Sequence, residues 1–571
     1  MQRLASLTAL VAVTAAGALA LAGTASAATG QAGTRTYVVL YEDGASPADA
    51  RAAIEQAGGR IVRENTKIGV ATVEADAQEF ESRAAAADPL VGAAPNEPIG
   101  EVPAQVRKDE RDLERMTDAR QAAAAKGAGK LQAPFSPVAG DPLAELQWDM
   151  RMIGATPEGS YDVTQGSHAV RVGIVDTGID GSHPDIAPNF NAALSRNFTV
   201  DDPVVDGACE SDPDGSCQDP ADVDEDGHGT HVAGTVAAPL NGIGIGGVAP
   251  GVELVNLRAG QDSGYFFLGP TLDALTYAGD HGIDVVNMSY YIDPWLFNCA
   301  ANPADSPAEQ REQQLIVAAT QRALTYAREH GVTLVAAEGN GHTDLGKPAV
   351  DGSSPDYPPD SERVRTIDNS CLNMPTEGEG VIGVTSVGPS ERKAYYSDYG
   401  VEQADVSAPG GDRRDYHGTD RYLSPANTIL APYPESLARA NGEIDADGQP
   451  TTPFVVADCS SGTCSYYQYL QGTSMASPHA TGVAALIVAR YGRRDRVNGG
   501  VTMDPALVER QLKRTARDTP CPEQNPFDYP DLGDEYTALC EGDASFNGFY
   551  GEGIVDAFAA VQGHKAPKLR R

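Results

Sequence analysis

The fold is indicated first by a short stretch, VRVGIVDTG at residues 170–178, in which an apolar strand runs directly into Asp176. From there towards the C-terminus, apolar strands alternate with amphipathic helices. Such alternation predicts an α/β fold with a parallel, doubly wound sheet and helices on both of its faces. In sheets of this kind the functional groups gather at the carboxyl ends of the strands. Asp176 therefore lies where a functional site is expected.

The α/β region is expected to span residues 142–563. Apolar runs predict its strands, and a spacing of 3.6 residues between apolar positions predicts its helices. The strands are expected at 170–175, 253–257, 283–288, 332–337 and 381–385, and the helices at 230–238, 270–281, 308–330, 475–491 and 505–516. The sequence shows no internal repeat.

The first 27 residues have the pattern of a signal peptide. A short basic start precedes an Ala- and Leu-rich run at residues 4–22, and Ala25-Ser26-Ala27 forms a small-x-small cleavage pattern. An uncleaved anchor is the alternative, because about 20 apolar residues could span a bilayer. The Ala and Gly content and the cleavage pattern favour removal. The sequence thus predicts a secreted, extracellular protein that no longer contacts a membrane.

A small α+β unit is expected at residues 35–100. Its strands are predicted at 36–41, at 68–73 and just before Pro95, and its helices at 47–58 and 78–87. Residues 101–141 are charged and rich in Ala, with little apolar face, and we interpret them as a linker. Residues 564–571 are expected to form a tail.

Composition and charge exclude several classes of protein. The chain has 571 residues, and its 42 Lys+Arg against 80 Asp+Glu give a formal net charge of −38. This charge argues against a nucleic-acid partner and against binding to an anionic membrane. The hydrophobic content of 41% is too high for a disordered chain, and 61 Gly with 39 Pro do not fit a coiled coil. A globular protein rich in turns is expected.

The eight cysteines all lie beyond residue 208. An even number of cysteines in an exported chain predicts disulfides. Neighbours in the sequence suggest three pairs and leave a fourth, although spacing alone does not determine the connectivity: Cys209–Cys217, Cys459–Cys464, Cys521–Cys540 and Cys299–Cys371. Because no CxxC spacing occurs, a zinc cluster is not expected.

Three segments place a reactive side chain beside glycine at the end of a strand or the start of a helix. They are VDTGID with Asp176, GHGTHVAG with His228 and GTSMASPH with Ser474. Each residue alone has a structural interpretation, since Asp and Ser are common in turns and helix caps and a single His is more often structural. Together they supply a nucleophile, a base that takes its proton, and a carboxylate that holds the base in the correct tautomer.

In this chain order, the three motifs resemble those of the subtilisin-like serine proteases, the subtilase family S8. The resemblance implies that Asp176 orients the imidazole, that His228 is the general base and that Ser474 is the nucleophile. His231 and Asp180 lie in the same motifs but do not match catalytic positions. The resemblance covers residues 142–563, and it implies a subtilisin-like sheet.

The segment VAAEGN at residues 335–340 resembles the family's oxyanion-hole segment. The resemblance implies that Asn340 donates to the oxyanion together with the main-chain N–H of Ser474. Glu338 departs from the family, where a small apolar residue is usual. We expect its carboxylate to be solvated; the alternative is that it biases the primary specificity pocket towards basic side chains.

Substrate binding is expected along Ser289, Tyr290 and Tyr291, which correspond to the family's substrate-binding strand. That strand pairs with the main chain of the substrate. The family usually continues with Leu-Gly-Gly, whereas this chain has two tyrosines, followed by Trp295 and Phe297. Broad specificity is therefore not assumed.

Calcium is expected only as a structural ion, and no cofactor is required for catalysis. Asp185 and Asn241 match calcium ligands of the family, and Gln147 is a further candidate. Residues 201–226 hold 11 acidic residues and no Lys or Arg. Part of this stretch is similar to the start of an EF-hand, but Ala233 stands where the loop needs Glu, so a solvated, disulfide-closed acidic loop is expected.

The unit at residues 35–100 resembles the family's inhibitory prodomain of the I9 type, with a ferredoxin-like fold. The resemblance implies a unit that templates folding, blocks the cleft and is removed; a permanent accessory domain is the alternative. Extra length relative to a minimal family member lies around residues 294–307, 348–375 and 413–464, which are expected to be surface loops near the cleft.

These features predict a serine endopeptidase that is secreted as an autoprocessed precursor and acts as a monomer on protein or peptide substrates through an acyl-enzyme, with its own prodomain as intramolecular inhibitor. A narrow-specificity processing protease is an alternative to a scavenging enzyme. A catalytically inactive, peptide-binding homologue is less favoured because all four site residues are present. A metallohydrolase is not favoured because no histidine lies in an HExxH motif.

Overall fold

The computed structural model describes residues 34–76, 79–96, 113–117, 141–209, 215–357 and 361–563. The predicted signal peptide, most of the predicted linker and the predicted tail lie outside these ranges. Among the helices that are described, none combines the length and the apolar character needed to cross a bilayer.

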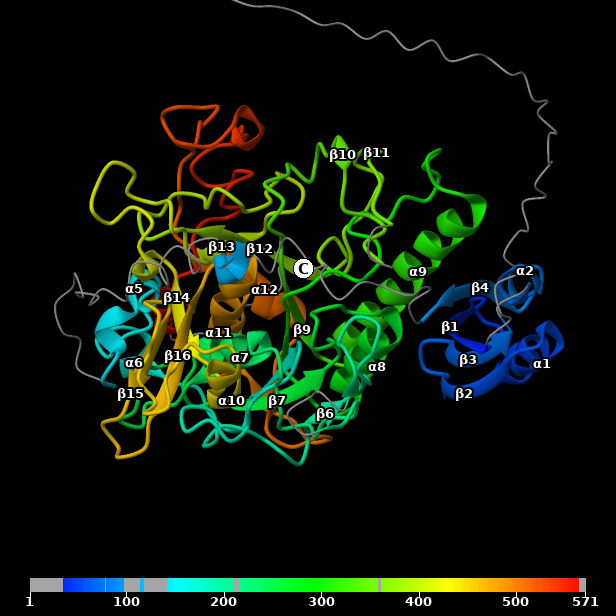
Figure 1. Ribbon diagram of the computed structural model, residues 1–571, viewed down its shortest axis with the longest axis horizontal. Helices are drawn as coiled ribbons and strands as arrows, with labels where there is room; N and C mark the ends of the chain where they lie inside the picture. Colours follow the sequence, from blue (N-terminus) through cyan, green and yellow to red (C-terminus); the bar gives the residue numbers. More distant parts are fainter. Residues whose placement is uncertain are drawn as a thin grey trace, which may run out of the picture.

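The described residues form a seven-stranded parallel sheet at the centre of the molecule (Figure 1). Apart from the two-residue edge strand at 196–197, its strands are rich in Val, Ile, Leu and Ala and are largely buried, as expected for a sheet covered on both faces. The strand order is β13 (Val406–Pro409), β12 (Val381–Val387), β9 (Thr333–Ala337), β8 (Val285–Met288), β5 (Arg171–Val175), β7 (Glu253–Arg258) and β6 (Arg196–Asn197). From β8 the chain proceeds outwards through β9, β12 and β13, whereas β7 and β6 lie on the other side of β5, which confirms the predicted doubly wound sheet.

Two apolar clusters cover the sheet, one on each face. The first contains the apolar side chains of α7 (His228–Ala237), α11 (Thr473–Tyr491), α12 (Pro505–Thr515) and α13 (Ala557–Gln562). The second contains those of α8 (Leu268–Asp280) and α9 (Pro307–Glu329). The predicted strands and helices of this region agree with the observed ones to within a few residues at each end.

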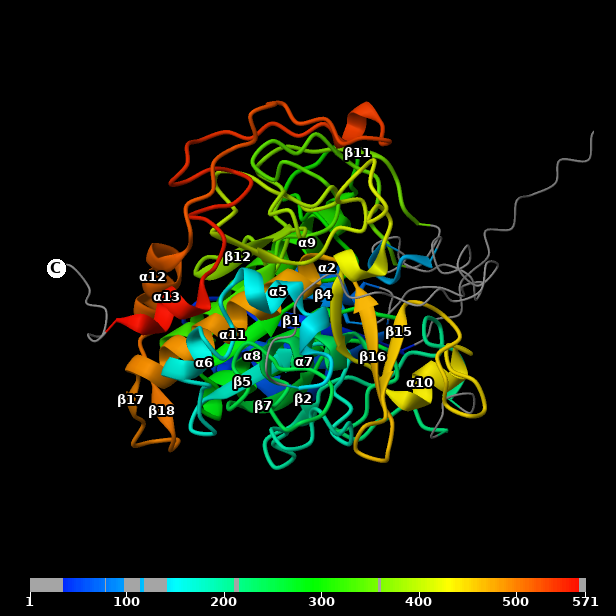
Figure 2. The ribbon, with the colours of Figure 1, turned by 90° about the vertical axis from the view of Figure 1, so that its left-hand side faces the viewer.

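A second, antiparallel sheet was not predicted. It consists of β14 (Ile429–Pro432), β16 (Ser465–Leu470) and β15 (Val455–Asp458), and α10 (Glu435–Ala440) follows β14. Figure 2 shows this sheet and α10 on one side of the molecule, with α12 and α13 on the other. Strands β14 and β15 lie in the segment 413–464. This segment therefore contains regular strands and is not only a surface loop.

Short elements complete the described part of the chain. The short helices are η1 (Ala144–Leu146), α5 (Trp148–Met152), α6 (Ser160–Val163), η3 (Pro425–Asn427) and η4 (Asp534–Tyr536). The short strand pairs are β10 (Val350–Asp351) with β11 (Arg365–Thr366), and β17 (Arg493–Arg494) with β18 (Val501–Thr502).

The N-terminal unit, residues 34–96, is a four-stranded antiparallel sheet with two helices. Its elements are β1 (Thr34–Tyr41), α1 (Pro47–Ala57), β2 (Arg60–Asn65), β3 (Val70–Asp76), α2 (Phe80–Ala85) and β4 (Leu90–Pro95), in the strand order β2-β3-β1-β4. This is the ferredoxin-like arrangement. Strand β2 was not predicted.

Both faces of the N-terminal sheet are apolar, and this explains where the unit lies. Tyr37, Val39 and Tyr41 of β1 pack against α1 and α2, while Val38 and Leu40, which point the other way, pack against α8 and α9. Figure 1 shows the unit beside these two helices. The sheet therefore joins the second apolar cluster of the α/β region.

Four disulfides pair the cysteines as the sequence suggested. They join Cys209 to Cys217, Cys299 to Cys371, Cys459 to Cys464 and Cys521 to Cys540.

Candidate active site

Asp176 and His228 meet at the carboxyl end of the central sheet. Asp176 directly follows β5, and His228 is the first residue of α7. His228 Nδ1 lies 2.7 Å from Asp176 Oδ1, which also accepts a hydrogen bond from the N–H of Thr177. A Cβ on Gly229 would lie 2.1 Å from the carbonyl oxygen of Gly178. Glycine at position 229 thus permits the close approach of α7 to the end of β5.

Ser474 lies in the first turn of α11, where the helix dipole favours negative charge. Asn340 follows β9 and is held by the same helix start, since its Oδ1 accepts hydrogen bonds from the N–H (2.9 Å) and the hydroxyl (3.0 Å) of Thr473. This leaves the amide nitrogen of Asn340 as a donor directed at the neighbourhood of Ser474.

One carboxylate lies between these groups, and it belongs to Glu114. Ser474 Oγ donates to Glu114 Oε1 at 2.6 Å, and Asn340 Nδ2 donates to the same oxygen at 3.1 Å. The other oxygen, Oε2, lies 3.4 Å from His228 Nε2. The predicted nucleophile, base and amide donor therefore converge on a space that holds one planar carboxyl group.

The electrostatics of this centre favour a charged imidazole. Burial alone would lower the pKa of His228, but the carboxylates of Asp176 and Glu114 outweigh burial and raise it to about 10. His231, three residues on, differs: burial lowers its pKa to about 3, and its Nε2 lies 3.1 Å from the carbonyl oxygens of Ile429 and Gln468. Its contacts are structural.

The three predicted substrate-binding residues differ in where their side chains lie. Ser289 is buried against α11, whereas Tyr290 is 9% exposed and its ring stacks on that of Phe266 with centroids 4.1 Å apart. The hydroxyl of Tyr291 donates to Asp356, which belongs to the inserted segment 348–375. The structure thus brings Ser289 to the candidate catalytic centre and directs Tyr290 into the core.

Glu338 is fully buried, so the expectation of a solvated carboxylate was wrong. Within the described residues neither carboxylate oxygen has a hydrogen-bond partner, and one of them fills the space over Gly383 in β12. Burial, with Glu377, Asp405 and Asp398 nearby, raises the pKa of Glu338 well above its ordinary value. Burial thus favours the neutral form of this carboxyl group.

The predicted calcium ligands gather around the loop at residues 241–246. Asp185 is buried; its Oδ2 accepts hydrogen bonds from the N–H of Ile245 and the hydroxyl of Tyr467, while its Oδ1 has no partner within the described residues. Asn241 lies beside it, with Nδ2 3.4 Å from the carbonyl oxygen of Pro184. Burial raises the pKa of Asp185 to about 8.

Two further side chains border this loop. Asp141 Oδ1 accepts from the N–H of Gly242, and its buried Oδ2 has no partner among the described residues. Gln147 bonds the main chain of Gly246 through both amide atoms. Buried oxygen atoms without donors suit a hard cation such as calcium, so these residues fit the expected ion.

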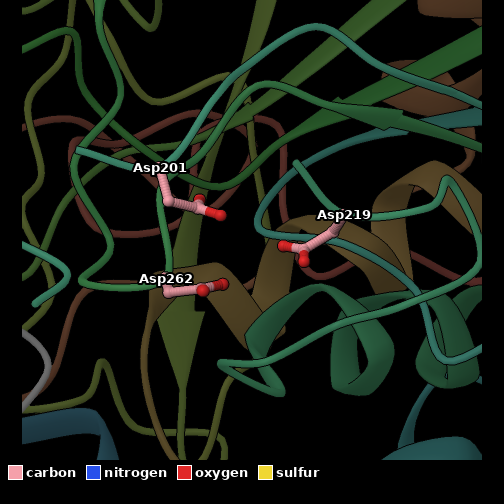
Figure 3. A group of neighbouring side chains, drawn as sticks. All are labelled: Asp201, Asp219 and Asp262. Atoms are coloured by element: carbon pink, nitrogen blue, oxygen red, sulfur yellow. The ribbon is translucent and has the colours of Figure 1, made fainter. Parts of the chain in front are cut away.

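Two carboxylates of the acidic stretch 201–226 form a second group together with Asp262. Figure 3 shows the carboxylates of Asp201, Asp219 and Asp262 directed towards one another. The guanidinium of Arg258 pairs with all three, at 2.6 Å from Asp201 and 3.0 Å from Asp262. The expectation of a wholly solvated loop was therefore wrong, because part of it is buried around this cation, which already fills the place of a metal ion.

Sequence reasoning missed Glu114. It lies in the charged stretch interpreted as a linker, and its neighbours form no recognised motif. A carboxylate 360 residues from Ser474 carries no local signal that it enters the site.

Comparisons with known proteins agree with this geometry. A model of the Subtilase family matches residues 167–553. A thermophilic serine proteinase of Bacillus sp. (strain AK1) is 30% identical over 337 residues, 59% of this chain and 56% of that protein. Subtilisin DY of Bacillus licheniformis is 27% identical over 393 residues, 69% of this chain and 91% of that protein. Fervidolysin of Fervidobacterium pennivorans is 28% identical, over 39% of its length. The chain thus spans about half the length of two of these relatives.

Solved structures show the same fold. The crystal structure of the epidermin leader peptide processing serine protease EpiP from Staphylococcus aureus has a TM-score of 0.58 at 20% identity, covering 93% of this chain and 98% of that one. Fervidolysin, described as a keratinolytic enzyme related to subtilisin, has a TM-score of 0.55 at 22% identity, covering 95% of this chain and 62% of that one. Because the family model matches more than half of the chain and the fold agrees, this protein belongs to the subtilase family of serine proteases.

Proposed function

We propose that the chain is the precursor of a secreted serine endopeptidase, with Asp176, His228 and Ser474 as its catalytic triad. The convergence of Ser474 Oγ, Asn340 Nδ2 and His228 Nε2 on one carboxyl group is the observation that carries this proposal. A carboxyl group has the planar shape of a peptide group, with a second oxygen in the place of the amide nitrogen. A space that holds one in contact with these atoms could equally hold a scissile carbonyl.

The chemistry follows from these positions. Ser474 Oγ would attack the carbonyl carbon while His228 Nε2 takes its proton, and Asp176 would stabilise the imidazolium through Nδ1. The developing oxyanion would accept hydrogen bonds from Asn340 Nδ2 and from the N–H of Ser474. His228 would then return the proton to the leaving amine, and water would release the acyl group from Ser474.

The N-terminal unit is proposed to be the inhibitory prodomain. Its β4 ends at Pro95, and Asn96 Oδ1 accepts a hydrogen bond from the N–H of Gly269 at the start of α8 (2.8 Å). Ion pairs join Arg63 to Asp273 and Lys67 to Asp280 across the same contact. These contacts support a unit that binds α8 and α9 while it remains attached.

A role as a narrow-specificity processing protease is the second candidate. Tyr290 is stacked on Phe266, and Tyr291 is tied to Asp356 of an insertion, so aromatic rings and an extra loop border the substrate-binding strand. EpiP, whose name describes leader peptide processing, shares the fold. Profiling with a peptide library separates the two roles: cleavage after one or two residue types supports processing, and cleavage after many types supports scavenging.

A structural calcium ion is proposed at the loop 241–246. Asp185 and Asn241, together with Asp141 and main-chain carbonyls of the loop, would hold it. The ion would neutralise the buried carboxylates, and it has no part in the catalytic steps.

The proposed activity is tested with a fluorophosphonate probe on the mature, prodomain-free enzyme, followed by mass spectrometry. An adduct on Ser474 that the variant Ser474→Ala lacks supports the triad; a folded mature enzyme that takes up no probe contradicts it. Activity should also fall below about pH 6.5, where an unperturbed imidazole becomes protonated. A flat profile down to about pH 4 would exclude His228 as the base.

A further inference from the structure

We propose that residues 113–117 are an intramolecular lock of the precursor, with the carboxylate of Glu114 occupying the oxyanion site. This inference rests on the proposed function, because it takes Ser474 and His228 as the catalytic pair. The lock is separate from the N-terminal unit: Figure 1 shows the light blue turn beside α11, apart from the blue unit next to α9.

Glu114 satisfies the catalytic groups in place of a substrate. Among the described residues, the single hydroxyl proton of Ser474 has Glu114 Oε1 as its near acceptor (2.6 Å) and the carbonyl oxygen of Ser289 as a distant one (3.5 Å), and it makes no hydrogen bond to His228. The hydroxyl proton is therefore directed away from the base. The imidazole in turn lies between the carboxylates of Asp176 and Glu114, which favour its protonated form. A protonated His228 cannot accept the proton of Ser474, so both halves of the attack are blocked.

The turn is anchored on both sides of Glu114. Arg115 forms an ion pair with Asp226 and donates to its carbonyl oxygen (3.0 Å), and Asp226 Oδ1 accepts the N–H of His228. Met116 is 1% exposed and joins an apolar cluster with Leu430, Phe454 and Tyr469, among others. The ion pair of Arg115 and the apolar contacts of Met116 thus hold the carboxylate of Glu114 in place.

Residues 113–117 also form hydrogen bonds with Gln471 of the α/β region. The N–H of Gln471 donates to the carbonyl oxygen of Glu114 (3.3 Å), and the side chain of Gln471 donates to that of Leu113 (3.2 Å). A Cβ on Gly472 would lie 2.8 Å from Glu114 Oε1, so the side chain of Glu114 uses space that glycine leaves free.

This lock differs from a substrate bound ready for cleavage. Residues 113–115 are helical, so a side-chain carboxylate and not an extended peptide bond faces Ser474. A carboxylate is a poor electrophile. With the side chain of Glu114 in the site, no peptide bond of the described residues lies next to Ser474 Oγ for attack. Because the turn is tethered to the chain at both ends, its effective concentration at the site is high, and it need not bind tightly to keep the site closed.

The test measures how fast a fluorophosphonate probe labels Ser474 in the unprocessed full-length precursor, which is separated from the processed form by size. We compare the wild type with Glu114→Ala, Glu114→Gln and Arg115→Ala, and use Glu158→Ala, which removes an exposed carboxylate before α6, as the matched control. A charged hydrogen bond of this kind should slow labelling by about 10- to 100-fold. We therefore expect faster labelling by that factor in Glu114→Ala, a smaller gain in Glu114→Gln and Arg115→Ala, and none in Glu158→Ala.

Equal labelling rates for wild type and Glu114→Ala would overturn the lock, and so would a Glu114→Gln precursor that labels as slowly as the wild type. Glu114→Gln preserves the shape of the side chain, so it provides the answer if Glu114→Ala fails to fold. The mature wild-type enzyme distinguishes the two proposals. If it labels while the precursor variants do not differ, only the lock fails; if it does not label, the proposed function fails.

Discussion

Ser289 Oγ donates a hydrogen bond to the main-chain carbonyl of Ser474 at 3.1 Å. That carbonyl lacks its usual helical donor, because the residue four positions later in α11 is Pro478, which has no N–H. The side chain of a residue expected to bind substrate thus also completes the first turn of the helix that carries the proposed nucleophile. Asn287 Nδ2 donates to Ser289 Oγ at 2.8 Å and links the arrangement to β8.

We expect Ser289→Ala to destabilise the protein by about 1–2 kcal/mol, because the buried carbonyl of Ser474 loses its partner. The rate constant kcat should fall with it, since Ser474 is then held less firmly. Urea unfolding and steady-state kinetics check both effects, with the exposed Ser353→Ala as control. An unchanged midpoint and kcat would show that the hydrogen bond has no energetic role.

We expect Asn340→Leu to lower kcat of the mature enzyme by about 10²–10³, with little change in KM; this magnitude is the one known for the equivalent donor in subtilisin and is borrowed from the family. The physical reason is that the amide donor acts on the oxyanion and not on the bound substrate. Steady-state kinetics on a peptide substrate provide the measurement.

Asn340 also accepts from Thr473 at the start of α11, so structural damage needs its own control. Asn340→Asp retains that acceptor but removes the donor. If Asn340→Asp kept wild-type kcat, the amide would not be the oxyanion donor.

We expect calcium removal to destabilise the protein more strongly as pH rises. Burial raises the pKa of Asp185 to about 8, above its unfolded value near 3.9. Without the ion, stability therefore falls as pH rises from about 4 to 8, because the folded state must ionise this buried group. Calcium offsets that cost. Thermal unfolding with and without EDTA at pH 6 and pH 9 measures the difference.

In Asp185→Asn the effect of EDTA on Tm should shrink, whereas it should persist in the exposed control Asp447→Asn. A wild-type Tm that EDTA leaves unchanged at pH 9 would contradict a calcium site at this loop.

We expect Glu338→Gln to raise stability at pH 8 and to weaken its dependence on pH. Burial raises the pKa of Glu338 above its unfolded value near 4.3, so the wild-type protein loses stability as pH rises above that value. Glutamine keeps the volume over Gly383 without a titrating group. Unfolding midpoints from pH 5 to pH 9 test this, with the exposed Glu379→Gln as control. Parallel pH profiles for variant and wild type would contradict the assignment.

Local patterns were sufficient for the central sheet with its helices and for the candidate triad. The alternation of strands and helices predicted the doubly wound sheet, because a strand or helix repeats its apolar positions every 2 or 3.6 residues wherever it lies in the chain. The glycine-flanked motifs around Asp176, His228 and Ser474 were visible for a similar reason, since each combines a reactive side chain with the tight turn that presents it. Three of the disulfides join near neighbours and could be suggested from spacing.

Only the tertiary structure decided which distant groups meet. Glu114 reaches Ser474 across 360 residues, and Arg258 gathers carboxylates from a loop expected to be solvated. Glu338 and Tyr290 are buried although their sequence context did not require it. In each case the outcome depends on how separate segments pack together, and packing depends on shape and charge supplied by residues far away in the sequence, which no local period or motif encodes.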